Sequence, residues 1–162
     1  MSMVRRMLRA EVVVLDTRAP AGGAPAADLV ELLTATSRRV ARTVAAALAE
    51  DSATLDGYRV LRSLVAEPGR TMGQLGAALQ LPGPTATRVV DALVAAALVY
   101  RLPDPADGRR VVVHPSALGR TRLVRWESLV RAREQALTGA LEHGQAESLA
   151  AALSRLLADD PA

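Results

Sequence analysis

The stretch from Arg70 to His114 constrains the fold most, because it contains a short helix, a break, a second helix and two β-prone runs. Thr71 favours a helix start, since its hydroxyl can accept a backbone N–H. The segment Leu81–Gly83 ends that helix, because proline disfavours helical geometry in the residue before it. Pro84 suits the first position of the second helix. The helical spacing predicts one buried face on this second helix, made of Ala86, Val89, Val90, Leu93 and Val94.

Two β-prone runs, Leu98–Leu102 and Val111–His114, follow the second helix and are separated by turn residues. This pattern predicts a β-hairpin, a wing, directly after the helix-turn-helix. The hairpin tip contains Arg109 and Arg110 and no apolar residue to pack against. We therefore expect the tip to project into solvent or into a nucleic-acid groove.

The face of the second helix opposite its apolar stripe is polar and begins at the helix N-terminus. Short polar side chains and an arginine at this place are what a helix needs to read the DNA major groove. Arg88 could contact guanine with both ends of its guanidinium, worth ~1–3 kcal/mol of discrimination. The alternative is an intrahelical ion pair with Asp91. Thr85 and Thr87 could bind phosphate or contact a thymine methyl group, or could only stabilise the turn.

These segments resemble the multiple antibiotic resistance regulator (MarR) family of winged-helix transcription factors. The matching text is Tyr58–Arg62, Thr71–Leu75, Pro84–Asp91 and the wing segment Asp104–Arg110. The resemblance in element order covers about Leu29 to Leu157. It implies a mainly α fold with a small β-hairpin wing (α+β), that is, a winged helix-turn-helix with N- and C-terminal dimerisation helices. Ala97 stands in the turn where the family usually has glycine before the wing strand.

The resemblance also implies roles in binding double-stranded DNA. Arg109 would enter the narrow, negative minor groove of A·T-rich DNA. Asp107 would orient this arginine, and Arg110 would reach a phosphate or pair with Asp104. Further positioning contacts are expected from Arg70, Thr71, Gln74 and Pro84. For Arg70 and Arg101 the alternative is surface charge or a local ion pair.

The chain is expected to consist of four parts. Residues 1–27 form a flexible arm, 28–53 a dimerisation helix, 54–115 the winged helix-turn-helix and 116–162 the C-terminal dimerisation helices. The predicted helices at both ends have more apolar surface than one small domain can cover, which favours a homodimer. Two-fold symmetry would place two reading helices ~34–36 Å apart on a near-palindromic operator.

The composition of the 162 residues favours a binding protein over an enzyme. The chain has 2 histidines, His114 and His143, and 0 cysteines, and the histidines lack metal-ligand spacing. We predict no catalytic residues, no metal and no cofactor. No apolar run approaches the ~20 residues of a membrane helix, so no membrane association and a cytoplasmic location are expected. All 20 basic residues are arginines, and the core must be aliphatic because Phe is absent.

The function predicted from the sequence is that of a homodimeric repressor released from its operator by a small-molecule ligand. The resemblance implies that the ligand lodges between the dimerisation helices and the DNA-binding lobe, and Arg39, Tyr58 and Trp126 are the candidate contacts. The alternative is a winged-helix protein-interaction module whose arginines bind acidic partners. Such a module would place large apolar residues where Thr85, Thr87 and Arg88 stand, which favours DNA binding.

Overall fold

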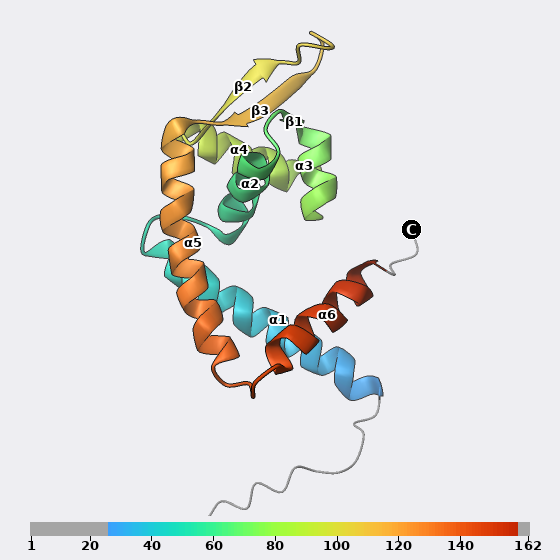
Figure 1. The fold of residues 1–162 in the computed structure, drawn as a ribbon. Coiled ribbons are helices and arrows are strands. Elements are labelled where there is room, and N and C mark those ends of the chain that lie inside the picture. The colour runs from blue at the N-terminus through green and yellow to red at the C-terminus, as the bar shows by residue number, and fades with distance from the viewer. Residues whose placement is uncertain (1–25, 159–162) are drawn as a thin grey trace, which may run out of the picture.

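A computed structural model describes residues 26–158 of the chain, and these residues form six helices and a three-stranded sheet (Figure 1). The elements are α1 (Ala26–Ala49), α2 (Leu55–Ala66), β1 (Arg70–Thr71), α3 (Met72–Leu79), α4 (Gly83–Ala95), β2 (Val99–Pro103), β3 (Val111–Pro115), α5 (Ala117–Thr138) and α6 (Gln145–Ala158). The predicted arm over residues 1–27 lies outside this range except for its last two residues, which belong to α1. The mainly α fold with a winged helix-turn-helix is confirmed.

The predicted hairpin is present, and a third strand extends it. β2 and β3 pair antiparallel with Leu102 opposite Val112, and β1 pairs with the other edge of β3, where Arg70 lies opposite Val113. A strand of two residues is too short to show periodicity in the sequence, so β1 was not predicted. It anchors the start of α3 to the base of the wing.

The helix ends follow the predicted capping chemistry. Thr71 accepts a hydrogen bond from the backbone N–H of Gln74, which confirms the predicted N-cap, and Ser116 likewise accepts one from Gly119 at the start of α5. Pro84 is the second residue of α4 and not the first, because Pro82 occupies the cap position. The predicted burial on α4 is wrong for Val94, which is 36% exposed.

Both helices of the helix-turn-helix are followed by a residue that has a left-handed backbone conformation but is not glycine. Gln80 follows α3 with φ of 53°, and Ala97 follows α4 with φ of 56°. In both turns the next residue's N–H bonds back to the helix, from Leu81 to the Gly76 carbonyl and from Leu98 to the Leu93 carbonyl, each at 2.9 Å. This 6→1 bond is the mark of a Schellman motif, in which glycine is preferred. Ala97 is the position where the family usually has that glycine.

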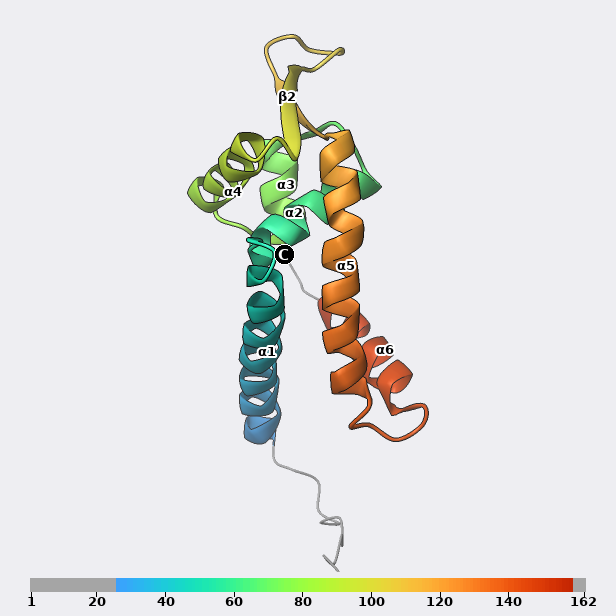
Figure 2. The ribbon, with the colours of Figure 1, turned by 90° about the vertical axis from the view of Figure 1, so that its left-hand side faces the viewer.

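The core lies inside the winged helix and is aliphatic apart from two aromatic rings. It is made of Leu48 of α1, Leu61 and Leu64 of α2, Leu75 of α3, Val90 of α4, Val113 of β3, and Leu123 and Trp126 of α5, with Tyr58 beside them. The lower part of α1 and all of α6 extend away from this core (Figures 1 and 2). Their leucines are largely uncovered, with Leu32 58% and Leu157 76% exposed. Within residues 26–158, no helix is both long and apolar enough to cross a membrane.

Candidate nucleic-acid interface

The helix α4 presents an open polar face beside the wing. In Figure 2 α4 lies on the outside of the winged helix, and the β2–β3 hairpin projects beyond all the helices. Arg88 and Thr87 of α4 and Arg109 of the wing tip are all exposed. The two arginines with the most specific predicted roles therefore lie on neighbouring elements, α4 and the wing.

Arg88 does not form the intrahelical pair that was the alternative to DNA contact. The carboxylate of Asp91 instead accepts from the guanidinium of Arg101 on β2, with a 2.6 Å distance between Nη2 and Oδ1. Across the described residues, the guanidinium of Arg88 has no hydrogen-bonding or ion-pair partner. The Asp91–Arg101 pair links α4 to the wing and leaves Arg88 available to a ligand outside the protein.

The first turn of α4 holds the other predicted contacts of this helix. The Thr87 hydroxyl donates to the Gly83 carbonyl at 3.0 Å, which leaves its methyl group and the oxygen's lone pairs exposed. Thr85 is half-buried and Pro84 is exposed. Thr87 therefore bonds back to its own helix, and it still offers an acceptor and a methyl group at the surface.

At the start of α3 the predicted contact residues bind one another. Thr71 and Gln74 form a capping box, in which the Gln74 side chain accepts from the Thr71 backbone N–H at 2.8 Å. Arg70 pairs with Glu67, so its local ion-pair alternative is realised. These bonds order the N-terminus of α3 and engage Oε1 of Gln74 and Nη2 of Arg70, whereas the Nε2 donors of Gln74 stay available for a phosphate.

The wing tip is shaped by its two aspartates. Asp104 accepts from the Ala106 backbone N–H at 2.9 Å, and Asp107 accepts from that of Arg109 at 3.1 Å. Asp107 also pairs with the guanidinium of Arg110 at 3.2 Å, so Arg110 does not form the pair with Asp104 that was the alternative to a phosphate contact. Asp107 thus holds Arg109 through its backbone and not through its side chain. The Arg109 guanidinium has no partner among residues 26–158.

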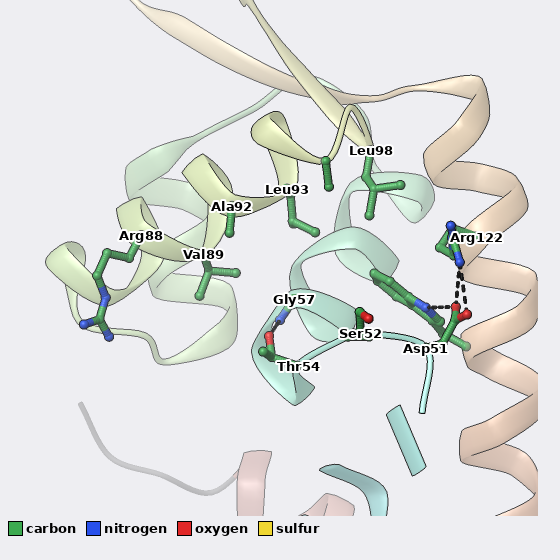
Figure 3. Close-up of a pocket in the computed structure, with 13 residues that line it drawn as sticks. Asp51, Ser52, Thr54, Gly57, Arg88, Val89, Ala92, Leu93, Leu98 and Arg122 are labelled. Carbon is green, nitrogen blue, oxygen red and sulfur yellow. Dashed lines mark hydrogen bonds and ion pairs between the residues drawn. The ribbon is translucent and has the colours of Figure 1, made fainter. Parts of the chain in front are cut away.

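A cavity of about 370 Å³ lies behind α4, between the α1–α2 turn and α5 (Figure 3). Its wall is mostly apolar, with Arg88 at the α4 end and Arg122 and Trp126 at the α5 end. Of the three candidate ligand contacts, Trp126 lines this cavity. Tyr58 is buried in the core, and Arg39 is exposed on α1.

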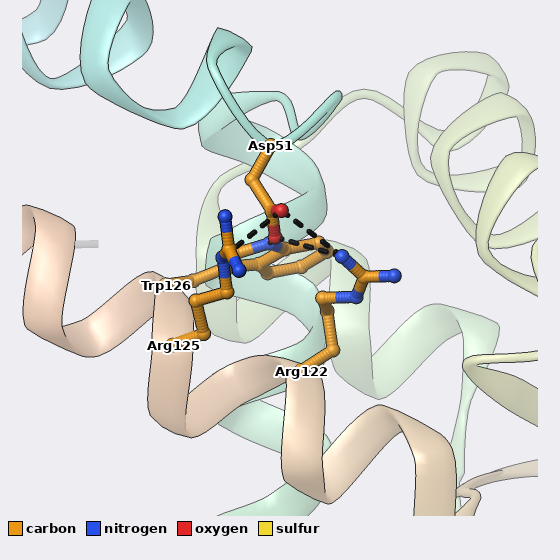
Figure 4. A network of polar contacts seen from close by, with 4 residues as sticks. All are labelled: Asp51, Arg122, Arg125 and Trp126. Atoms are coloured by element: carbon orange, nitrogen blue, oxygen red, sulfur yellow. Dashed lines mark hydrogen bonds and ion pairs between the residues drawn. The ribbon is translucent and has the colours of Figure 1, made fainter.

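A polar network on the cavity wall was missed by the sequence reasoning. Asp51 follows α1, and its side chain is 8% exposed. Its carboxylate accepts from both Arg122 and the indole N–H of Trp126, at 3.0 and 2.8 Å, and pairs with Arg125 at 3.0 Å (Figure 4). Burial alone would raise the pKa of Asp51, but the hydrogen bonds and the two positive charges outweigh it and hold this pKa below its ordinary value. The only signal in the sequence was the i, i+3, i+4 spacing of the α5 partners, which places them on one helix face.

A helix-turn-helix followed by a hairpin with basic side chains at its tip defines the winged-helix class of DNA-binding proteins. Residues 54–110 match the sequence model of the MarR family. The winged helix of this chain is therefore similar to the MarR family, whose members are DNA-binding transcriptional regulators and not enzymes. No curated protein sequence matches the chain.

Several solved structures share the fold. The transcriptional repressor CouR, bound to a 23-mer DNA duplex, is 26% identical, with a TM-score of 0.74 over 84% of this chain and 99% of that one. A mutant of MarR from E. coli complexed with operator DNA is 27% identical, with a TM-score of 0.73 over 80% and 94%. The S. aureus MepR–DNA complex is 25% identical, with a TM-score of 0.70 over 80% and 96%.

Proposed function

We propose that this chain is a homodimeric transcriptional repressor that binds a near-palindromic operator and is released by a small-molecule ligand. The observation that carries the proposal is the pair of exposed arginines without internal partners, Arg88 on α4 and Arg109 on the wing. An arginine on the reading helix suits guanine in the major groove, and one on the wing suits a narrow minor groove. The DNA complexes of CouR, MarR and MepR support this use of the fold.

The other predicted DNA contacts lie on the same elements as these two arginines or on the neighbouring helix α3. Thr85 and Thr87 would contact phosphate or a thymine methyl group from the first turn of α4, beside Pro84. Arg110 would reach a phosphate from the wing, where Asp107 sets its direction. Arg70, Thr71 and Gln74 would act mainly by ordering the N-terminus of α3, since their side chains bind each other and Glu67. Phosphate contacts of this kind fix the register and carry no sequence information.

A second copy of the chain would cover the apolar surface of α1 and α6. These helices line a groove of about 570 Å³ whose wall is almost wholly apolar, with Leu33, Val40 and Val44 on one side and Leu153, Leu156 and Leu157 on the other. Exposed leucines on this scale mark a protein interface, since no helix within residues 26–158 could cross a membrane. A two-fold dimer through α1, α5 and α6 would present two copies of α4 to successive turns of DNA.

The effector would bind in the cavity between α4, α5 and the α1–α2 turn. Its volume suits a small molecule, and the mixture of apolar wall and arginine side chains is typical of ligand sites. Because Arg88 belongs both to the cavity and to the reading helix, a bound ligand would affect DNA contact directly. Tyr58 and Arg39 would act at most indirectly. Release requires that the ligand bind the DNA-free arrangement more tightly than the DNA-bound one.

The proposal is tested by binding to the promoter fragment of its own gene across a salt series, with wild type beside Arg109→Ala. Arg62→Ala is the matched control, because it removes an exposed arginine of α2, which is not part of α4, the wing or the proposed dimer helices. Wild type and control should bind tightly, with log K falling by several units per unit of log salt, and Arg109→Ala should lose most of this affinity. If wild type prefers no fragment over random DNA, the proposal fails and the protein-interaction module takes its place.

A further inference from the structure

Asp51 occupies the point where the chain leaves α1 and enters the winged helix. All of its side-chain partners lie on α5, the other helix that leads away from the winged helix. The carboxylate receives two bonds from Arg122, one from Trp126 and an ion pair from Arg125, so both oxygens are fully used (Figure 4). One acid, whose side chain is 8% exposed, therefore joins the two helices that connect the DNA-binding lobe to the rest of the molecule.

This cluster differs from an ordinary surface ion pair. Trp126 is 3% exposed and fixed in the core, so the position of the indole N–H is set before Asp51 binds it. Without the carboxylate, two arginines would face each other and the buried indole N–H would lose its acceptor. The neighbouring pair of Glu50 and Arg133 also joins the end of α1 to α5, but it is 3.7 Å long and exposed on both sides. Exposed pairs of that kind contribute little.

The same cluster forms one wall of the cavity behind the reading helix. Asp51, Arg122 and Trp126 line it on one side, and Arg88, Val89 and Ala92 of α4 line it on the other (Figure 3). A shift of α5 against the α1–α2 turn would therefore change the support beneath α4. The cluster links the helices of the proposed dimer to the element of the proposed DNA contact.

We propose that Asp51 is a positioning residue for DNA binding, which fixes the angle between the winged helix and the pair α1 and α5. In a two-fold dimer this angle sets the separation and the relative direction of the two α4 helices. Asp51 touches no DNA itself, and it acts through Arg122, Arg125 and Trp126. The inference rests on the proposed homodimeric DNA-binding function.

The test compares Asp51→Asn with Glu50→Gln, which removes the charge of the adjacent, exposed acid. The probes are DNA duplexes selected from a random library by the wild-type protein, variants with half-sites moved by one or two base pairs, and a single half-site. Asp51→Asn should lose tenfold or more on the selected duplex and keep its affinity for the single half-site. It should also discriminate less between spacings. Glu50→Gln should behave as wild type on every duplex.

A distance measurement gives a second readout that does not depend on DNA. The chain has 0 cysteines, so Ala78→Cys on the exposed side of α3 puts one spin label on each protomer of a dimer. Pulsed electron paramagnetic resonance should give a narrow distribution of label distances in wild type and Glu50→Gln. The distribution of label distances should be broad in Asp51→Asn, because the angle between each winged helix and the helices α1 and α5 is no longer fixed.

The outcomes separate this inference from the proposed function. If wild type selects no duplex or forms no dimer, the proposed function fails and the inference with it. If wild type behaves as expected but Asp51→Asn keeps the same spacing preference and distance distribution, the inference alone is overturned. An equal loss on full and single sites also overturns it, since that indicates only a lower folded fraction. If Asp51→Asn does not fold, Arg122→Gln replaces it, because Arg122 gives the carboxylate two hydrogen bonds and its own side chain is 40% exposed. An unchanged spacing preference in that variant contradicts the inference.

Discussion

Gly119 of α5 lies against the backbone at the base of the wing, and adding one methyl group there should destabilise the fold. A Cβ at this position would lie 2.0 Å from the carbonyl oxygen of Leu98, 3.0 Å from its carbonyl carbon and 3.2 Å from Cδ1 of Leu61. An ordinary carbon–oxygen contact is about 3.3 Å, so α5 or the start of β2 would have to move by about 1.3 Å. That carbonyl cannot move freely, since it accepts the Ser116 N–H at 2.9 Å.

The net effect of Gly119→Ala follows from two opposed terms. Overpacking with a backbone shift costs about 3 kcal/mol, at the upper end of the usual range because the obstacle is backbone. Alanine in a helix recovers up to about 1 kcal/mol relative to glycine. The free energy of unfolding should therefore fall by about 2 kcal/mol, and Tm by about 4–8 °C for a chain of this size.

The assay is thermal unfolding followed by circular dichroism, at one protein concentration because a dimer's Tm depends on it. The matched control is Gly73→Ala in α3, where a Cβ would meet nothing within 4 Å. Helix propensity alone predicts that both substitutions stabilise, by up to about 1 kcal/mol. The structure predicts opposite signs. If Gly119→Ala were as stable as Gly73→Ala, the close approach of α5 to the wing base would be refuted.

Three other substitutions and conditions have defined outcomes. Ala97→Gly relieves the left-handed backbone after α4 and should raise stability by about 0.5–1 kcal/mol, seen as a higher midpoint in urea unfolding. Arg88→Ala should weaken binding to a selected operator about 10–100-fold and relax the preference at one base pair, measured by competition with single-base variants. Because the network lowers the pKa of Asp51, the stability that the ionised carboxylate contributes should persist down to the ordinary carboxyl range near ~3.9 and be lost below it. When Tm is measured at a series of pH values, it should therefore fall more steeply in acid for wild type than for Asp51→Asn.

The sequence predicted the winged helix well because each of its elements has a local signal. Thr71 and Ser116 mark helix starts through capping, Pro82 forces a break, and the turn residues before Arg109 separate two β-prone runs. Such signals act over a few residues and do not depend on the rest of the fold. The positions of Arg88 and Arg109 follow from them directly.

The parts that the sequence did not predict depend on contacts between distant segments. Asp51 contacts Arg122 and Trp126, which lie 71 and 75 residues further along the chain. No residue near Asp51 in the sequence indicates these contacts. Gly119 resembles any helical glycine until Leu98 is placed beside it. The partner considered for Asp91, as the alternative to DNA contact by Arg88, was on the same helix, but Arg101 reaches Asp91 from β2. The sequence indicates that an aspartate will pair with an arginine, but only the fold shows which arginine lies beside it.

The central claim is that two copies of this chain read DNA with α4 and the wing. The most direct measurement is hydroxyl-radical footprinting of the protein on a duplex selected from a random library. The account predicts two symmetric protected regions centred about 10–10.5 base pairs apart, with outer protection at A·T-rich positions that disappears in Arg109→Ala. A single protected region, or an identical footprint for Arg109→Ala, would contradict it.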